Sequence, residues 1–331
     1  MDQTFSGIRR ATGSAHHNDT AGMSMSRSSI ADIYWNRYQV RRDATDLDVA
    51  ISNYDHSVRL TSELDPVRYI RLFTLGYALH TRFQGTGDIL DIDKACACFD
   101  SSLHLQPLDT RACCTMNALV RALVDRFSRN QNITDVHHAI TILQMAVDII
   151  HDRDFTKTFY LNTLGFTLRM RFEYLGHVSD MEASIASHQK AADLTPNDHP
   201  KKGEWLTTLS SALGFRFQCF GNPADLNESV AANQTAVALT PDDHSNKSLY
   251  LSNYGSTLRL RYIYRGDLSD LEAAATSHRI AVDLLPEGHP QRRFYLWNYG
   301  LALELRFQHF KDFADMEAAV VAHQMALELV R

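Results

Sequence analysis

Apolar and polar residues alternate along most of the chain with the spacing of amphipathic helices. In one representative stretch, a single stripe is formed by Leu296, Tyr299, Gly300, Leu303 and Phe307. A second helical pattern follows, from residue 315 to about residue 329. The two patterns predict a pair of consecutive helices with polar outer faces, the first of about five turns.

This helical pair is repeated seven times with a nearly constant period. Each copy contains an Arg followed by Phe or Tyr, and nine residues later an Asp followed by a hydrophobic residue. The arginines are Arg37, Arg82, Arg126, Arg171, Arg216, Arg261 and Arg306, and the aspartates are Asp46, Asp91, Asp135, Asp180, Asp225, Asp270 and Asp315. Successive copies lie 45 residues apart, except for one step of 44 after Arg82. Such a period is typical of a solenoid of repeated supersecondary units.

Local signals predict where the second helix of a repeat begins and ends. Ser179 with Glu182, and Ser269 with Glu272, fit the Ser-x-x-Glu capping box, and the repeated Asp stands in the first turn, where the helix dipole favours a negative charge. The helix is expected to end before a proline that recurs every 45 residues, at Pro196, Pro241 and Pro286.

Two helices bury too little apolar surface alone, so each hairpin must pack on the next. The sequence therefore predicts an all-α solenoid of about seven helix-turn-helix repeats, about fourteen helices, wound into one superhelix. The expected repeats span residues 29–65, 66–108, 109–153, 154–198, 199–243, 244–288 and 289–331. Residues 1–28 are polar, rich in Gly, Ser and His, and without apolar periodicity, which predicts a disordered tail.

The repeats resemble tetratricopeptide repeats (TPRs). The resemblance covers residues 29 to 331 and rests on Tyr254, Gly255, Leu258, Ala274, Ala281 and Pro286 in the sixth repeat, and on Leu164, Gly165, Leu168, Ala191 and Pro196 in the fourth. The ordinary TPR has 34 residues, so these repeats are longer. They resemble the long-repeat arrays of many fungal proteins, which often precede a CHAT domain, a relative of caspase-like proteases.

The resemblance implies a non-catalytic scaffold that binds a protein or peptide in the concave groove of the array. The alternative is a regulatory or sensor portion of a CHAT-type protease system, without the protease domain, because the repeated helices leave no room for the α/β pattern of that domain. The chain contains no GxSxG, GxxxxGK[ST] or strand-following GxGxxG motif, so we predict no enzymatic activity and no cofactor.

Composition narrows the class of partner. The net charge of −6 and the pI near 6.2 provide no basic footprint, which argues against nucleic acid as the main ligand. No apolar stretch reaches the length of a membrane span, and no secretory signal is evident. Five cysteines in a large chain favour a reducing compartment, so we expect a cytoplasmic protein.

The recurring arginines have two interpretations. The favoured one is a structural ladder, in which each Arg meets the helix-start Asp of its own or a neighbouring repeat. The other is a basic track along the groove for an acidic peptide. Because Arg and Asp recur together in all seven repeats, the ladder is the stronger hypothesis.

Histidines and cysteines raise the question of metal. One column comprises His188, His278 and His323, and a loop column comprises His199, His244 and His289. Equivalent positions in stacked helices lie about 8–10 Å apart, too far for one zinc ion, so packing and loop hydrogen bonds are predicted instead. The cluster Cys96, Cys98, Cys113 and Cys114 is expected to hold free thiols, with metal or redox pairing as the minor alternative.

The first helix of a TPR lines the concave face. The resemblance therefore implies groove candidates two positions before the residue that corresponds to the Gly of the TPR pattern. They are Thr74, Thr163, Thr208, Asn253 and Asn298. Their short polar side chains suit the backbone of an extended peptide, although solvation of that face is an equal alternative. The carboxylate clamp of chaperone-binding TPRs is not assembled. The last repeat is expected to expose apolar surface, which suggests end-to-end self-association, a truncated product or a fragment.

Overall fold

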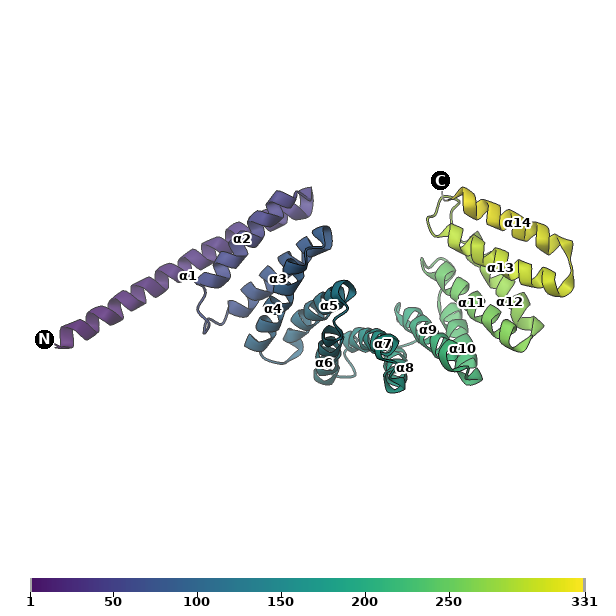
Figure 1. Ribbon diagram of the computed structural model, residues 1–331, viewed down its shortest axis with the longest axis horizontal. Helices are drawn as coiled ribbons and strands as arrows, with labels where there is room; N and C mark the ends of the chain where they lie inside the picture. Colours follow the sequence, from purple (N-terminus) through teal and green to yellow (C-terminus); the bar gives the residue numbers. More distant parts are fainter. Residues whose placement is uncertain (1, 330–331) are drawn as a thin grey trace. The chain divides into compact units, whose positions relative to one another are not determined.

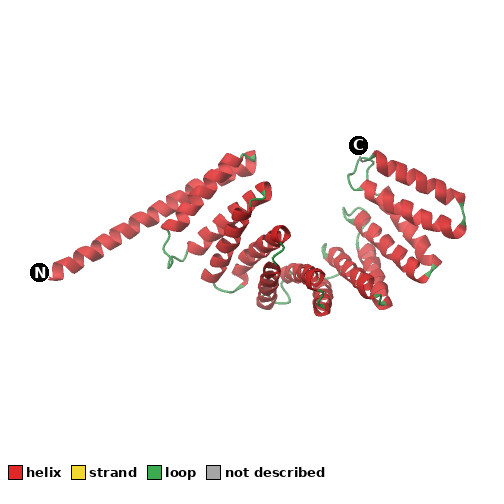
Figure 2. Ribbon diagram, in the orientation of Figure 1, coloured by secondary structure: helices red, strands yellow, loops and turns green. Residues whose placement is uncertain are grey.

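The computed structural model describes residues 2–329, with side chains from residue 20 onward, and every regular element in this range is helical. Figure 2 shows the helices joined by loops, with no strand in the described part of the chain. The fourteen α-helices are α1 (Asp2–Arg41), α2 (Ala44–Leu60), α3 (Arg68–Thr86), α4 (Ile89–Leu105), α5 (Cys113–Asn130), α6 (Ile133–Ile149), α7 (Thr156–Leu175), α8 (Val178–Asp193), α9 (Lys202–Phe220), α10 (Pro223–Leu239), α11 (Lys247–Arg265), α12 (Leu268–Asp283), α13 (Arg292–Phe310) and α14 (Phe313–Glu328).

The helices pack as seven hairpins, each made of an odd-numbered helix and the even-numbered helix that follows it (Figure 1). Contacts between Cα atoms divide the chain into two compact units. The first, through His151, contains α1–α6, and the second, from Asp152, contains α7–α14. Within each unit, every hairpin also packs against the next one. The expectation of an all-α stack of about seven helix-turn-helix repeats is therefore confirmed.

The second helices α8 and α12 begin two residues earlier than the capping boxes predict. In six of the seven repeats, α12 among them, the residue before the second helix is an Asp or Asn whose side chain accepts from a backbone N–H two residues on. For α12 this residue is Asp267, which accepts from the Ser269 N–H, so Ser269 is inside the helix and is not its cap. The same holds for Ser179 in α8, whose cap position is His177. The prediction was wrong because both Asp267 and Ser269 are good cap residues, and only the backbone shows which one precedes the helix.

In every repeat, the first helix is followed by a residue with a left-handed backbone conformation. It is a glycine in four repeats, Gly87, Gly176, Gly221 and Gly266, and a residue with a side chain in the other three, Arg42, Gln131 and Lys311. Its N–H donates to a carbonyl four residues back, at 2.7 to 2.8 Å. This turn is 45 or 44 residues from its neighbours, like the Arg–Asp pattern, and it makes each hairpin bend in the same way.

Helix α1 starts before the predicted beginning of the array. Ser24 is buried, and its hydroxyl lies 2.8 Å from the Ser57 carbonyl of α2 and 2.9 Å from the hydroxyl of Thr61, the residue that follows α2. Arg27 donates to the Asn53 side chain at 2.9 Å. Residues 20–28, which the sequence assigns to a disordered tail, therefore belong to the first hairpin. Their contacts are polar, so an apolar period could not detect them.

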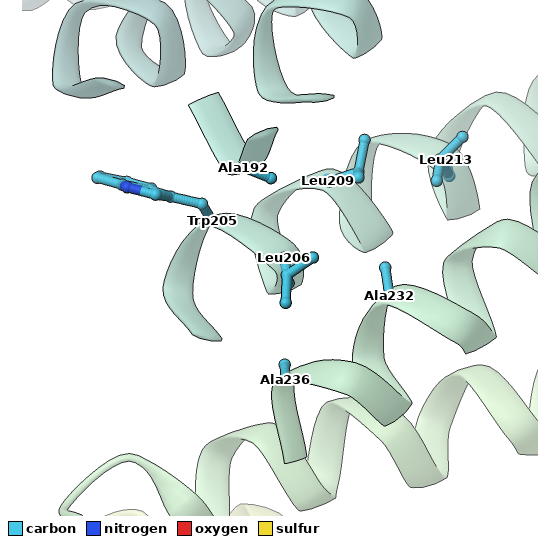
Figure 3. Packing of buried hydrophobic residues seen from close by; sticks show 7 residues of the cluster. All are labelled: Ala192, Trp205, Leu206, Leu209, Leu213, Ala232 and Ala236. Atoms are coloured by element: carbon cyan, nitrogen blue, oxygen red, sulfur yellow. The ribbon is translucent and has the colours of Figure 1, made fainter. Parts of the chain in front are cut away.

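Small residues allow close packing in the core of each hairpin. In the cluster of Figure 3, the Trp205 ring, 1% exposed, lies with Leu206, Leu209 and Leu213 of α9 near alanines of the flanking second helices, Ala192, Ala232 and Ala236. Burial of a large aromatic side chain is among the strongest single apolar contributions to a hairpin.

The glycine and histidine columns pack against each other. A Cβ added to Gly165 would lie 2.5 Å from His188 Nε2, and one added to Gly255 would lie 2.8 Å from His278 Nε2. The two positions are 23 residues apart, one on each helix of the hairpin. Across all repeats they hold Ala31 with Tyr54, Gly76 with Phe99, Val120 with Leu143, Gly165 with His188, Ser210 with Asn233, Gly255 with His278, and Gly300 with His323. A ring on one helix is thus matched by a small residue on the other, and the His column is a packing feature.

A second set of basic side chains, besides the ladder arginines, joins consecutive hairpins. Lys247 Nζ donates to the Val237 and Thr240 carbonyls at 2.9 and 2.7 Å, at the end of α10. Lys202 binds the end of α8 in the same way, and Arg68 and Arg292 bind the ends of α2 and α12. A cation at this place satisfies carbonyls that have no partner within their own helix. These residues recur with the 45-residue period and were missed in the sequence.

Candidate interaction surface

The seven arginines and seven aspartates are paired, each Arg with the Asp of its own repeat. In the first six pairs, Nε and Nη2 of the Arg donate to the two carboxylate oxygens, with Nε–Oδ2 distances between 2.7 and 3.0 Å. The last pair is looser, with Arg306 Nε 3.5 Å from Asp315 Oδ2. The Arg ends the first helix, the Asp begins the second, and together they tie the two helices of the hairpin at its turn.

Burial of this ladder is uneven. The Asp side chains are buried, whereas the Arg side chains keep between 22% and 45% of their surface exposed. Hydrogen bonds from the Arg37 guanidinium lower the pKa of Asp46, and the same bonds raise the pKa of Arg37. In the first unit, Arg82 and Arg126 each meet a further carboxylate of the preceding repeat, Asp48 at 2.7 Å and Asp93 at 3.1 Å. The ladder arginines are thus neutralised within the fold.

The five groove candidates lie on first helices and are all half-buried. Two of them bond only to their own helix: the Thr74 hydroxyl donates to the Arg71 carbonyl at 2.9 Å, and the Thr163 hydroxyl donates to the Phe159 carbonyl at 2.8 Å. Such back-bonding is the ordinary behaviour of Thr in a helix.

The other three candidates lie between neighbouring first helices of the second unit. The Thr208 hydroxyl of α9 lies 2.9 Å from Asn162 Oδ1 of α7, and Asn298 Nδ2 of α13 lies 3.4 Å from Ser252 Oγ of α11. Asn253, in α11, lines an open pocket. The column is therefore partly used to link consecutive first helices, and Asn253 is the member that faces open space.

The loop histidines form hydrogen bonds within their own loops. His199, His244 and His289 each accept, through Nδ1, a hydrogen bond from the backbone N–H two residues on, at 3.1 to 3.2 Å. In the described part of the chain, no three His, Cys, Asp or Glu side chains are arranged to hold a metal ion.

The cysteines Cys96 and Cys98 both belong to α4. Removal from water raises the pKa of the Cys96 thiol to about 12 and that of Cys98 to about 11. A thiol with such a raised pKa is a poor nucleophile and a poor metal ligand at neutral pH. Cys113 and Cys114 begin α5 and are more exposed than Cys96.

A polar pocket of about 380 Å³ opens on the second unit. Its walls come from four helices: Arg169 from α7; Ser210, Ser211, Gly214, Phe215 and Gln218 from α9; Ser229 and Asn233 from α10; and Asn253, Ser256, Thr257, Arg259 and Leu260 from α11. Two arginines and eight hydroxyl or amide side chains line it, and no carboxylate does. This concentration of donors without an acid is unusual for a chain whose net charge is −6.

Only Asn253 among the pocket residues was selected from the sequence. The position two residues before each ladder Arg could have identified three more of them, Arg169, Gly214 and Arg259. Across the seven repeats this position is occupied by Trp35, His80, Val124, Arg169, Gly214, Arg259 and Glu304. A column that changes from repeat to repeat within a regular array marks a surface that the fold does not constrain.

Comparison with known proteins supports the fold. No family model and no curated protein matches the sequence. Among solved structures, the C-terminal part of a TPR repeat-containing protein from Cytophaga hutchinsonii superposes with a TM-score of 0.60 at 12% identity, covering 91% of this chain and 98% of that one. The chain has the fold of a TPR protein.

A second solved structure is similar over less of the chain. BtubC from P. vanneervenii superposes with a TM-score of 0.51 at 15% identity, covering 72% of this chain and 92% of that one. At such low identity the likeness concerns the fold alone. None of the helices described here combines the length and the apolar character needed to cross a bilayer.

Proposed function

We propose that this chain is a non-catalytic scaffold that binds a peptide or protein segment along the first helices of its second unit. The observation that carries the proposal is the open, donor-rich pocket on α9 and α11, which contains Asn253 of the groove column. Hydroxyl and amide groups on one face can pair with the backbone of an extended segment. The TPR fold supports this use because its stacked hairpins present a long continuous surface.

The pairing of the ladder arginines supports the same proposal, because it argues against the alternative of a basic track along the groove. Each already pairs with an Asp of its own repeat, so the basic track that they suggest in the sequence is not available to a ligand. The contacts that remain for a partner are the polar groups between the first helices.

A pull-down from native extract with the full chain tests the proposal. The informative variant combines Asn253→Ala with Ser256→Ala, both in the pocket, and the matched control combines Lys190→Ala with Gln234→Ala, exposed on the second helices α8 and α10. A partner that is captured by wild type and control but lost from the pocket variant supports a first-helix scaffold. Equal capture by all three proteins contradicts it. Circular dichroism checks that every variant is folded.

A further inference from the structure

The fifth repeat differs from its two neighbours at the position two residues before the ladder Arg. The fourth and sixth repeats have Arg169 and Arg259 there, and the fifth has Gly214. A Cβ added to Gly214 would meet only Ser229 Oγ, at 3.8 Å, so the space next to this glycine is open. The missing side chain leaves a gap in the array, and an Arg stands on either side of it.

The floor of the gap is also altered. The fourth and sixth repeats fill the space between their helices with the pairs Gly165–His188 and Gly255–His278. The fifth repeat has Ser210 and Asn233 instead, and Ser210 Oγ lies 2.7 Å from Ser229 Oγ. An aromatic filling is thus replaced by hydroxyl and amide groups in the one of these three repeats that lacks the Arg.

Neither flanking Arg is held by a buried carboxylate, as each ladder Arg is. Arg259 forms no ion pair with a carboxylate of the described chain, and its Nε is buried without a hydrogen-bond partner. Arg169 Nε lies 3.4 Å from Glu173, a half-exposed residue one turn further along α7, and its guanidinium lies 5.4 Å from the centre of the Phe215 ring. A partly buried guanidinium without an acid is costly for the fold.

We propose that the pocket over Gly214 binds a carboxylate side chain of an acidic peptide, held between Arg169 and Arg259. This inference rests on the proposed function and adds the chemistry of the bound segment. The Arg fork suits a carboxylate, and the surrounding hydroxyl and amide groups suit its remaining lone pairs and the neighbouring peptide backbone. The pocket volume of about 380 Å³ has room for an acidic side chain together with adjacent backbone.

Fluorescence anisotropy with two labelled octapeptides tests the inference on the full chain. One peptide alternates Glu and Ser, and the other has Gln in place of Glu. We expect the Glu peptide to bind at least tenfold more tightly than the Gln peptide, and Arg259→Gln to remove that preference. Arg279→Gln, an exposed Arg on α12 of the same unit, is the control and should keep it.

A second variant keeps the test decisive if Arg259→Gln alters the fold. Gly214→Arg places in the fifth repeat the side chain that its neighbours carry, so it should fill the pocket and lower affinity for the Glu peptide by at least tenfold. Equal affinity for the Glu and Gln peptides, or unchanged affinity in both variants, would overturn the inference. Tighter binding of a phosphoserine peptide than of the Glu peptide would overturn the carboxylate assignment.

The pull-down separates this inference from the proposed function. If Arg259→Gln still captures the partner and the Asn253→Ala, Ser256→Ala variant does not, the scaffold stands and the carboxylate pocket is wrong. If all these variants capture the partner equally, the scaffold face itself is wrong.

Discussion

The fifth hairpin, α9 and α10, and the sixth, α11 and α12, have the same architecture and different surfaces. Both have the Arg–Asp pair, the left-handed Gly that closes the first helix, and a Lys that binds the end of the preceding second helix. They differ inside the hairpin, where the fifth has Ser210 with Asn233 and the sixth has Gly255 with His278. They also differ at the position two residues before the ladder Arg, which is Gly214 in the fifth and Arg259 in the sixth. The comparison shows that the Arg–Asp pair, the left-handed Gly and the Lys form a constant frame, whereas the position two residues before the ladder Arg varies from repeat to repeat. The proposed ligand site lies at that varying position.

The largest expected effect concerns the shared frame. Asp270→Ala leaves the Arg261 guanidinium, 22% exposed, without its partner, and it also removes an acid from the first turn of α12. We expect a loss of about 3 kcal/mol in the free energy of unfolding. Asp225→Ala in the fifth hairpin should cost the same, because the frame is common to both. Urea unfolding followed by circular dichroism measures both changes.

The control for the frame is an exposed pair. Asp283→Ala removes the partner of Arg279 on the surface of α12, where both side chains are more than half exposed. It should cost less than about 0.5 kcal/mol. A loss from Asp283→Ala as large as that from Asp270→Ala would mean that the ladder is an ordinary set of surface pairs.

The next effect separates the two hairpins by pH. Burial first, and then the nearby charge of Arg259, lowers the pKa of His278 to about 4, while the unfolded value is about 6.5. Because the unfolded chain takes up the proton more readily, stability falls as pH drops below about 6.5 and levels off near pH 4. At pH 5 the loss is about 2 kcal/mol per buried His.

Unfolding curves at pH 7 and pH 5 for wild type and His278→Asn check this prediction. The variant, which copies Asn233 of the fifth hairpin, should lose about 2 kcal/mol less than wild type between the two pH values. His188 has the same lowered pKa for the same reason, with Arg169 as the nearby charge, and His188→Asn should behave alike. Equal pH dependence in all three proteins would show that these rings titrate normally in the folded state.

A smaller effect probes the interior pair itself. Gly255→Ala places a Cβ 2.8 Å from the His278 ring and should cost about 1.5 kcal/mol through overpacking. In the His278→Asn background the same change should cost less than about 0.5 kcal/mol, because the ring is gone. Gly214→Ala is the matched control: it meets nothing closer than 3.8 Å, so it should be neutral or stabilising. Thermal melts of the four proteins complete the cycle, and a cost independent of residue 278 would exclude the proposed complementarity.

The smallest effect concerns the turn that ends each first helix. Gln131 has a φ of 55° where Gly221 of the fifth hairpin has a φ of 70°. Gln131→Gly should therefore raise the free energy of unfolding by about 0.5 kcal/mol, and Gly221→Gln should lower it by a similar amount. Thermal melts of the two variants measure this exchange, and a change of the same sign in both would contradict it.

The sequence by itself determined the repeat, its period and its helices. Helical periodicity, the recurring prolines and the recurring Arg and Asp are local signals, and each is read within a few residues, so the fold class followed from them. The start of α1 did not follow, because Ser24 and Arg27 join the first hairpin through polar contacts that carry no apolar period. The cap of α12 was predicted at the wrong residue because Asp267 and Ser269, two residues apart, are both suitable helix caps.

Tertiary structure alone decided which polar groups are satisfied. Arg259 and Arg261 stand two residues apart on one helix, yet Arg261 meets Asp270 and Arg259 meets no carboxylate of the described chain. The division into two units and the pocket over Gly214 likewise depend on helices that are 45 or more residues apart in sequence. Residue types and spacing specify how each helix forms. Only the stacking of one hairpin on the next brings Arg169 and Arg259 to the same pocket, because that contact exists between repeats and not within any of them.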